Sequence, residues 1–242
     1  MEAISDLCVE PITDIGLVTI PLRGGATSTV FTLRNDLHRE PFGLTFGITF
    51  EKDCPPTPDF DLCESFFEEA SKVAGDCHCY KLVLADRRRG KAGEPNPYAD
   101  PRFDEWNWGV VMSRSLTVSP NGIAAAGDPS VSKIVPPPPI GNRFCKDVEG
   151  KRVGRTFLYV VTDPVNRETV GFVEDVHVAE EATAEVGLGR RLNRAAIEAA
   201  GAAGCAVNVL TVRHSKPRVA NYYRRFGYEV DGLELRRNLV TV

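Results

Sequence analysis

The first fifty residues contain short hydrophobic stretches separated by turn-forming residues. Residues 17–22 and residues 30–33 are two such stretches, and Gly24 and Gly25 lie between them. Over residues 44–50, hydrophobic side chains occupy every second position, which is the period of a strand with one buried face. The N-terminal region is therefore predicted to be β structure.

A helix is predicted after this region. Asp61 can cap its N-terminus, with Glu64 three residues later in a variant of the capping box. Gly75 suits the left-handed position that ends a helix, and residues 80–85 have the composition of a strand. The hydrophobic residues that share the helix face to be buried are Phe66, Ala70 and Val73.

Residues 87–150 differ in composition from the rest of the chain. They are basic at first, then rich in Pro, Gly and Asn, and they include four consecutive prolines at 136–139 that favour a stiff extended spacer. Residues 108–112 and 115–118 can pair as a hairpin. Because plain connections are seldom this long, the stretch is interpreted as an insertion or a lid.

The pattern becomes regular from about residue 153. Residues 156–161 and 170–178 are predicted strands joined by a turn-rich link, and residues 207–212 are predicted to form another strand. A long helix lies between the last two, with Gly204 at its end. A short helix over residues 220–226 and a final strand from Tyr228 complete the chain. The residues assigned to the buried face of the long helix are Leu188, Leu192, Ala195, Ala199 and Ala203.

The charge balance excludes some partners. The net charge is −4, from 29 basic and 33 acidic residues, so no sustained positive field favours a nucleic acid or an anionic membrane. Arg87, Arg88 and Arg89 are interpreted as a solvated loop after a strand. No apolar stretch approaches the roughly 20 residues that span a bilayer, and the acidic start lacks the features of a signal peptide. The expected location is therefore the cytoplasm.

The chain has seven cysteines, an odd number that indicates reduced thiols in a protein of this size. Cys77, His78 and Cys79 suggest a metal site, but adjacent residues on a strand point to opposite faces. These cysteines are therefore interpreted as small apolar residues entering a buried strand. No metal is predicted. Cys205 is expected to be buried and not to act as a nucleophile.

A glycine loop precedes the long helix. Gly187 and Gly189 lie between a strand and the helix start, where backbone N–H groups and the helix dipole favour an anion. Alone, this pattern is more often a tight turn. The exposed backbone of Val176, His177 and Val178 can bind an extended amide-bearing ligand, and a phenol such as Tyr223 can protonate a departing thiolate.

With these residues in place, the segment resembles the GCN5-related N-acetyltransferase (GNAT) superfamily. In that superfamily G-x-G/A precedes the helix, and a later Tyr stands four residues ahead of Gly-aromatic. Tyr223, Gly227 and Tyr228 meet this spacing. Within the superfamily, residues 170–178 and 222–228 are similar to the G-H-I-E-D-V-x-V and F-Y-K-K-F-G-Y motifs of the glucosamine 6-phosphate N-acetyltransferase family.

The resemblance implies an α/β fold, the GNAT acyl-CoA N-acyltransferase fold, with a mixed, mostly antiparallel sheet flanked by helices. A long insertion is added to it here. The expected division is residues 1–86 for the N-terminal part of the fold, 87–152 for the Pro/Gly-rich insertion, and 153–242 for the C-terminal core with the acetyl-CoA site.

The resemblance also implies roles for individual residues. Glu174 and Asp175 would lie at the acceptor amine, bind sugar hydroxyls and help to remove a proton directly or through water, and Tyr223 would protonate the coenzyme A thiolate. Arg236 and Arg237 would bind a phosphate, across a homodimer in the family; an edge-strand charge pair explains them equally well. Acetyl-CoA would be held by Val176, His177, Val178, Val186, Gly187, Leu188, Gly189 and Arg190.

Three functions remain open from the sequence. The first is acetyl transfer from acetyl-CoA to a small amine, glucosamine 6-phosphate above all, by direct attack in a ternary complex. The second is the same chemistry on a protein amine or another metabolite, because Val207 stands where the family has a substrate-binding Lys and because of the insertion. The third is a non-catalytic acyl-CoA-binding or scaffold protein, because Ala184, Glu185 and Val186 replace the cation-bearing part of the family's loop.

Overall fold

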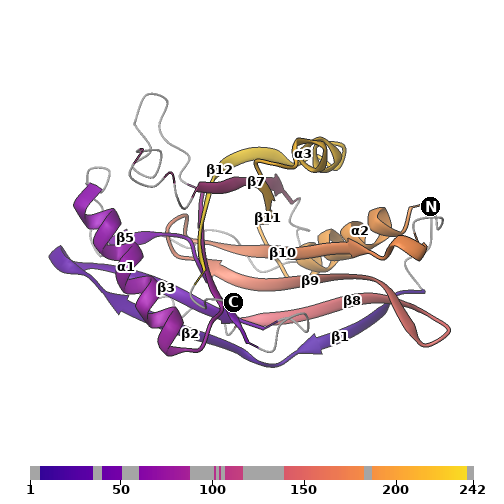
Figure 1. Ribbon diagram of the computed structural model, residues 1–242, viewed down its shortest axis with the longest axis horizontal. Helices are drawn as coiled ribbons and strands as arrows, with labels where there is room; N and C mark the ends of the chain where they lie inside the picture. Colours follow the sequence, from indigo (N-terminus) through magenta and orange to yellow (C-terminus); the bar gives the residue numbers. More distant parts are fainter. Residues whose placement is uncertain are drawn as a thin grey trace. The chain divides into compact units, whose positions relative to one another are not determined.

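The computed structural model describes residues 6–34, 40–50, 60–87, 101, 104, 107–116, 139–182 and 187–238 (Figure 1). The chain divides into two compact units, each assembled from three stretches. Unit 1 comprises Met1–Thr13, Arg114–Thr162 and Glu168–Leu210. Unit 2 comprises Asp14–Ser113, Asp163–Arg167 and Thr211–Val242. Both units therefore draw on all three segments into which the sequence was divided at residues 86 and 152.

Unit 1 contains a sheet with the strand order β1-β8-β9-β10-β11. β8 pairs antiparallel with β1 on one side and with β9 on the other, whereas β10 and β11 run parallel. Only the first four residues of β11 belong to this unit. The strands are β1 (Cys8–Ile12), β8 (Ile140–Val148), β9 (Lys151–Asp163), β10 (Glu168–Val178) and β11 (Val207–Arg213).

Helix α2 (Leu188–Ala202) packs on β10 and β8 of unit 1 (Figure 1). Leu188 and Leu192 are buried on its sheet-facing side as predicted, but Ala203 is exposed. Gly154 of β9 permits this close approach, because a Cβ there would lie 2.8 Å from the Leu188 side chain. The helix ends as predicted at Gly204, whose φ of 76° is left-handed.

Unit 2 contains a second set of strands in the order β7-β12-β6-β4-β3-β2, and β5 also pairs with β3. β4 and β6 are parallel, and the other pairs with stated registers are antiparallel. The elements are β2 (Ile15–Pro21), η1 (Arg23–Gly25), β3 (Ala26–Leu33), β4 (Phe42–Thr45), β5 (Ile48–Phe50), α1 (Phe60–Asp76), β6 (Lys81–Asp86), β7 (Asn107–Ser115), α3 (Pro217–Arg224) and β12 (Glu229–Asn238).

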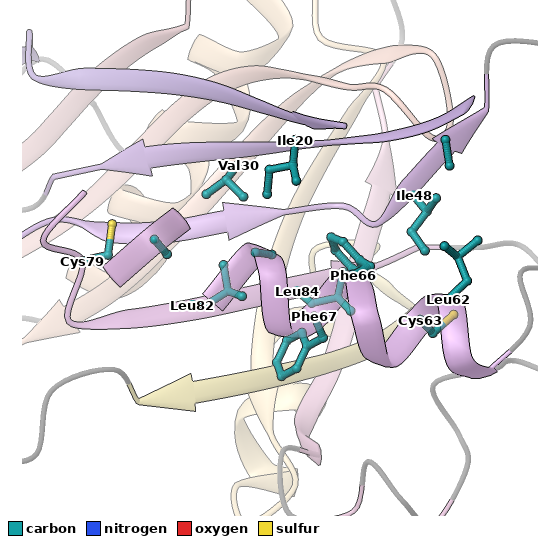
Figure 2. Packing of buried hydrophobic residues seen from close by; sticks show 13 residues of the cluster. Ile20, Val30, Ile48, Leu62, Cys63, Phe66, Phe67, Cys79, Leu82 and Leu84 are labelled. Atoms are coloured by element: carbon teal, nitrogen blue, oxygen red, sulfur yellow. The ribbon is translucent and has the colours of Figure 1, made fainter. Parts of the chain in front are cut away.

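The core of unit 2 lies between α1 and the strands β2, β3 and β6. Figure 2 shows Phe66 and Phe67 of the helix among Ile20, Val30 and Leu82 of the strands. Each of these side chains is at most 5% exposed. Burying a side chain of this size contributes about 1.5–3 kcal/mol, so the helix is held mainly by its hydrophobic face.

Several sequence-based expectations in unit 2 are wrong in detail. Residues 44–50 fall in two strands, and residues 44–48 are buried on both faces, since Thr45 is 0% exposed and lies 3.2 Å from the Ser28 hydroxyl. Helix α1 begins at Phe60, so Asp61 lies in its first turn. The residue in the left-handed conformation after the helix is His78, with φ 59°, and not Gly75 as expected. Cys77 to Cys79 consequently lie in a turn before β6 and not in a strand.

Two further expectations are contradicted by the pairing of distant strands. Residues 107–115 form the single strand β7, so the turn expected at 113–114 does not occur, and residues 117 and 118 of the expected hairpin lie outside the described residues. β12 pairs with β7 on one side and β6 on the other, so Arg236 and Arg237 do not lie on an edge strand. Among the described residues, no helix has the length and hydrophobicity needed to cross a membrane.

Candidate functional site

The end of β10 departs from regular strand geometry. The parallel ladder with β11 runs from Val170, opposite Val207, to Val173, opposite Leu210, whereas β10 continues to Val178. Residues 174–178 therefore extend beyond this ladder, which leaves their backbone groups on that edge outside it. The sequence singled out this stretch because of its exposed backbone.

Asp175 lies at the centre of this stretch with φ 52°. A non-glycine residue in the left-handed region inside a strand marks a local bulge, which redirects side chains. Such backbone strain costs about 1–3 kcal/mol and occurs preferentially at functional sites. The period-two pattern of residues 170–178 gave no sign of this bulge.

The adjacent acidic residues Glu174 and Asp175 of β10 are contacted by side chains of β9. The Arg155 guanidinium donates to the Asp175 carboxylate at 2.9 Å, with the two side chains 23% and 31% exposed. The Thr156 hydroxyl donates to the backbone carbonyl of Glu174 at 3.4 Å. Glu174 and Asp175 are half-buried, as is Val176. Arg155 thus orients the Asp175 carboxylate, a contact that sequence reasoning missed because it requires knowing that β9 and β10 are neighbours.

The start of α2 has the features of an anion-binding helix terminus. Gly187 is its N-cap with φ 92°, and no side chain caps the first turn. The first N–H groups of a helix have no partner within it, and glycine reaches this φ without strain. Leu188 is buried, Gly189 is half-buried and Arg190 is exposed. Ala184, Glu185 and Val186 lie outside the described residues.

Asp6 of the N-terminal segment contacts the same helix. Its carboxylate accepts hydrogen bonds from Arg191 at 3.0 Å and from Lys146 at 2.9 Å. These cations lower the pKa of Asp6, chiefly through the hydrogen bond from Lys146. Arg191 is consequently paired with a carboxylate near the helix start, and Arg190 is the exposed cation there.

The tyrosines of α3 lie in unit 2. Tyr223 is 7% exposed and packs edge-on against Tyr222 and Tyr228, with ring centroids 5.2 Å and 5.7 Å apart. Its backbone carbonyl accepts the N–H of Phe226 at 2.8 Å. Tyr222 is half-buried. The ring of Tyr223 is thus fixed by aromatic packing, while α3 itself begins at Pro217, three residues before the predicted start.

Arg236 and Arg237 of β12 are both engaged by carboxylates within unit 2. Arg236 donates to Glu234 at 2.7 Å and Arg237 donates to Glu68 of α1 at 2.7 Å. The Arg236 guanidinium also lies 4.3 Å from the centroid of the Trp108 ring. Trp108 could not be found from the sequence, because a single aromatic residue in a strand gives no sign of such stacking.

His177 and His214 differ in environment, and Cys79 and Cys205 are buried thiols. His177 is exposed, and His214 Nε2 lies 2.9 Å from Asn107 Oδ1. Burial raises the pKa of Cys205 to about 12 and, together with the charge of Cys77, raises that of Cys79 to about 12. Both thiols are therefore protonated at neutral pH and are poor nucleophiles. The expectation that Cys205 is buried is confirmed.

Residues 134–228 match the family model described as "Acetyltransferase (GNAT) family". This segment is similar to GNAT acetyltransferases. It includes β8 to β11, α2 and α3, and thus the strand bulge, the glycine loop and Tyr223. The predicted GNAT fold, a mixed and mostly antiparallel sheet with helices, is confirmed. The GNAT family uses acetyl-CoA.

Solved structures with GNAT folds resemble the chain at low identity. An acetyltransferase from Trypanosoma brucei is 24% identical over 38% of this chain and 63% of its own, with a TM-score of 0.32. A tandem GNAT protein from the clavulanic acid biosynthesis pathway is 11% identical over 94% of this chain and 84% of its own (TM-score 0.46). A GCN5-related N-acetyltransferase from Kribbella flavida is 16% identical over 90% and 88% (TM-score 0.44). No curated protein matches the sequence.

Proposed function

We propose that the chain is an N-acetyltransferase that moves an acetyl group from acetyl-CoA to a primary amine by direct attack in a ternary complex. The observation that carries the proposal is the GNAT match over residues 134–228, which contains the bulged strand end and the uncapped glycine start of α2. Acetyl-CoA supplies the activated acetyl thioester when it is bound. The remaining chemistry is positioning and proton transfer by side chains and backbone.

The residues of unit 1 fit the two ends of such a ligand. The backbone of Val176 and Val178 lies beyond the β10–β11 ladder and can hydrogen-bond an extended chain of amides. At the other end, the first N–H groups of α2 after Gly187 suit a pyrophosphate, with exposed Arg190 adding positive charge. His177, Leu188 and Gly189 belong to the same two stretches.

Proton transfer is assigned to three side chains. The acceptor nitrogen must lose a proton as its bond to the acetyl carbon forms, and Glu174 or Asp175 accepts it directly or through water. Arg155 orients the Asp175 carboxylate through their ion pair, which favours Asp175 for positioning and Glu174 for accepting the proton. As the carbon–sulfur bond breaks, Tyr223 donates its phenolic proton to the sulfur. No acyl-enzyme is formed.

Glucosamine 6-phosphate is the first acceptor to test, because residues 170–178 and 222–228 are similar to motifs of the family that acetylates it. A second candidate is another amine, on a protein or a metabolite. It is favoured by the pairing of Arg236 with Glu234 and of Arg237 with Glu68, which reduces the positive potential left for a sugar phosphate. Val207 in place of the family's Lys supports the same candidate.

An assay of thiol release from acetyl-CoA across a panel of amines tests the proposal. We expect acetyl-CoA-dependent release with at least one primary amine, and the highest kcat/KM with glucosamine 6-phosphate. A higher value for a peptide N-terminus or a polyamine would favour the second candidate. If calorimetry detects acetyl-CoA binding but no amine releases thiol, the chain is the non-catalytic acyl-CoA-binding protein. Absence of binding at millimolar acetyl-CoA would contradict both enzyme functions and leave only the scaffold protein.

Gly187→Ala is expected to weaken acetyl-CoA binding about 2–10-fold, the loss of roughly one backbone hydrogen bond. The Cβ strains the left-handed N-cap and disturbs the first N–H groups of α2. Gly150→Ala is the matched control, since Gly150 has φ 76° in the β8–β9 turn of the same unit and open space around its Cβ position. Calorimetry should give wild-type affinity for the control. Equal losses in both variants would argue against a pyrophosphate site at Gly187.

A further inference from the structure

Cys8 and Cys145 face each other across two strands of unit 1. They are Cα partners in the antiparallel pair of β1 and β8. Directly opposite residues in such a pair have Cα atoms about 4.5–5.5 Å apart. A disulfide spans Cα separations of about 4.4–6.8 Å. The backbone therefore already has the separation that a cross-strand bridge needs.

The two thiols are also brought together by their contacts. The Cys8 thiol donates to a Glu10 carboxylate oxygen at 3.6 Å, and the Cys145 thiol reaches the same oxygen at 3.8 Å. Cys145 also donates to the backbone carbonyl of Cys8 at 3.6 Å. The two sulfurs and the Glu10 oxygen all lie within 4.8 Å of one another. Rotation about the side-chain bonds is sufficient to bring sulfur to sulfur.

The same three side chains could hold a soft divalent cation, but the surrounding charges oppose it. Arg143 forms an ion pair with the Glu10 carboxylate, and Arg152 lies 3.4 Å from it. A cation would have to share this carboxylate with two guanidinium groups. Structural zinc sites also close four ligands around the ion, and only three side chains are grouped here among the described residues. A disulfide adds no charge and leaves both ion pairs intact.

We propose that Cys8 and Cys145 form a thiol–disulfide exchange site that is oxidised by a small-molecule disulfide. Cys8 is exposed and Cys145 is buried, so Cys8 reacts with the reagent first and Cys145 reacts second. The Cys8 thiolate attacks one sulfur of the reagent, whose disulfide breaks and releases one thiol. Cys145 then loses its proton and attacks the Cys8 sulfur, which forms the cross-strand bond and releases the second thiol. Two protein thiols are oxidised and one reagent disulfide is reduced to two thiols.

The environment of Cys145 suits the resolving role. Burial, assisted by the hydrogen bond with Cys8, raises the pKa of Cys145 to about 11, so this thiol reacts slowly with outside reagents. Once Cys8 carries the mixed disulfide, the attacking and attacked sulfurs belong to paired residues, and proximity compensates for the small thiolate fraction. Arg152 favours the thiolate electrostatically.

The bridge would fasten the N-terminal strand to unit 1. Asp6, two residues before Cys8, already binds Lys146 of β8 and Arg191 of α2. Joining Cys8 to Cys145 closes a loop of more than a hundred residues, which reduces the conformational freedom of the unfolded chain. We expect oxidation to raise the thermal midpoint by roughly 5–10 °C.

Incubation of the folded protein with oxidised glutathione tests this inference. We expect peptide mapping to find a Cys8–Cys145 linked peptide, and thiol titration in denaturant to fall from seven to five, because the bridge consumes two of the seven cysteines. Cys145→Ser should instead accumulate a glutathione adduct at Cys8, and Cys8→Ser should form neither product. Cys205→Ser, which removes a buried thiol elsewhere in unit 1, should still form the bridge.

Three results would overturn the inference. The first is a stable glutathione adduct at Cys8 of the unaltered chain with no linked peptide. The second is no reaction at either cysteine. The third is stoichiometric Zn²⁺ binding that protects both thiols and is lost in each serine variant, which would identify a metal site instead. These readouts do not depend on acetyl transfer.

Discussion

Replacing Tyr223 with Phe is expected to lower kcat about 10²–10⁴-fold, the usual contribution of a general acid. The variant keeps the ring that packs edge-on against Tyr222 and Tyr228 and removes only the phenolic hydroxyl. The departing sulfur must then take its proton from water. Because the hydroxyl is assigned to the leaving group and not to binding, calorimetry should give an acetyl-CoA affinity within about twofold of the original.

Tyr222→Phe is the matched control for this prediction. Tyr222 is the adjacent residue of α3, is less buried, and packs against both Tyr223 and Phe226. It should retain most of the turnover in the thiol-release assay. Undiminished turnover in Tyr223→Phe would remove it as the acid, and a larger loss in Tyr222→Phe would assign that role to its neighbour.

Replacing Arg87 with Met should destabilise unit 2 by about 3–5 kcal/mol, as is typical when one member of a buried ion pair is removed. Arg87 was interpreted from sequence as part of a solvated loop, and that interpretation is wrong. Its side chain is 0% exposed, with Nε 3.1 Å from Asp231 and Nη1 3.2 Å from Asp163, which is also 0% exposed. Met fills the space of the aliphatic stem but leaves the Asp163 carboxylate buried without its cation.

Urea unfolding of Arg34→Met provides the comparison. The Arg34–Asp14 pair in the same unit is exposed, with side chains 46% and 68% accessible, so its loss should cost less than about 1 kcal/mol. Similar losses in the two variants would contradict the assignment of Arg87 as a structural cation. Adding Asp163→Asn to Arg87→Met should restore part of the stability, since it removes the unpaired charge while keeping an acceptor for the N–H groups of Val165 and Asn166.

The stability of Arg87→Met is expected to depend on pH. Burial raises the pKa of Asp163, so the folded state binds this proton more tightly than the unfolded state. The cost of the ionised carboxylate is full above the raised folded pKa and disappears as the pH falls to the ordinary pKa of an aspartate. The deficit of Arg87→Met relative to the unaltered chain should therefore shrink as the pH is lowered through that window.

The features that the sequence predicts well are those set by short-range pattern. The long helix ends at Gly204, and the strands at 156–161, 170–178 and 207–212 are present, because hydrophobic periodicity and a left-handed glycine act within a few residues. The GNAT resemblance likewise depends on a contiguous stretch. The acceptor, the dimer and the roles of individual site residues that this resemblance implies stay predictions.

The features that were missed depend on residues far apart in the chain. Arg87 is buried because Asp163 and Asp231 approach it from two distant segments, and β12 is internal because β7 pairs with it. Arg155 meets Asp175, and Cys8 meets Cys145, only once strand neighbours are known. The φ of Asp175 was also missed, because no glycine or proline in residues 170–178 other than Gly171 marks a departure from regular strand geometry.

The interleaved order of the two units has a consequence for biosynthesis. Unit 1 includes Met1–Thr13 but cannot be completed until Leu210 has left the ribosome, and unit 2 awaits β12 near the end of the chain. Domains built from contiguous sequence fold one after another during translation, whereas here each unit stays incomplete until its third stretch has been synthesised. Neither unit could be produced alone by truncating the chain at one point, because each needs three separate stretches of it.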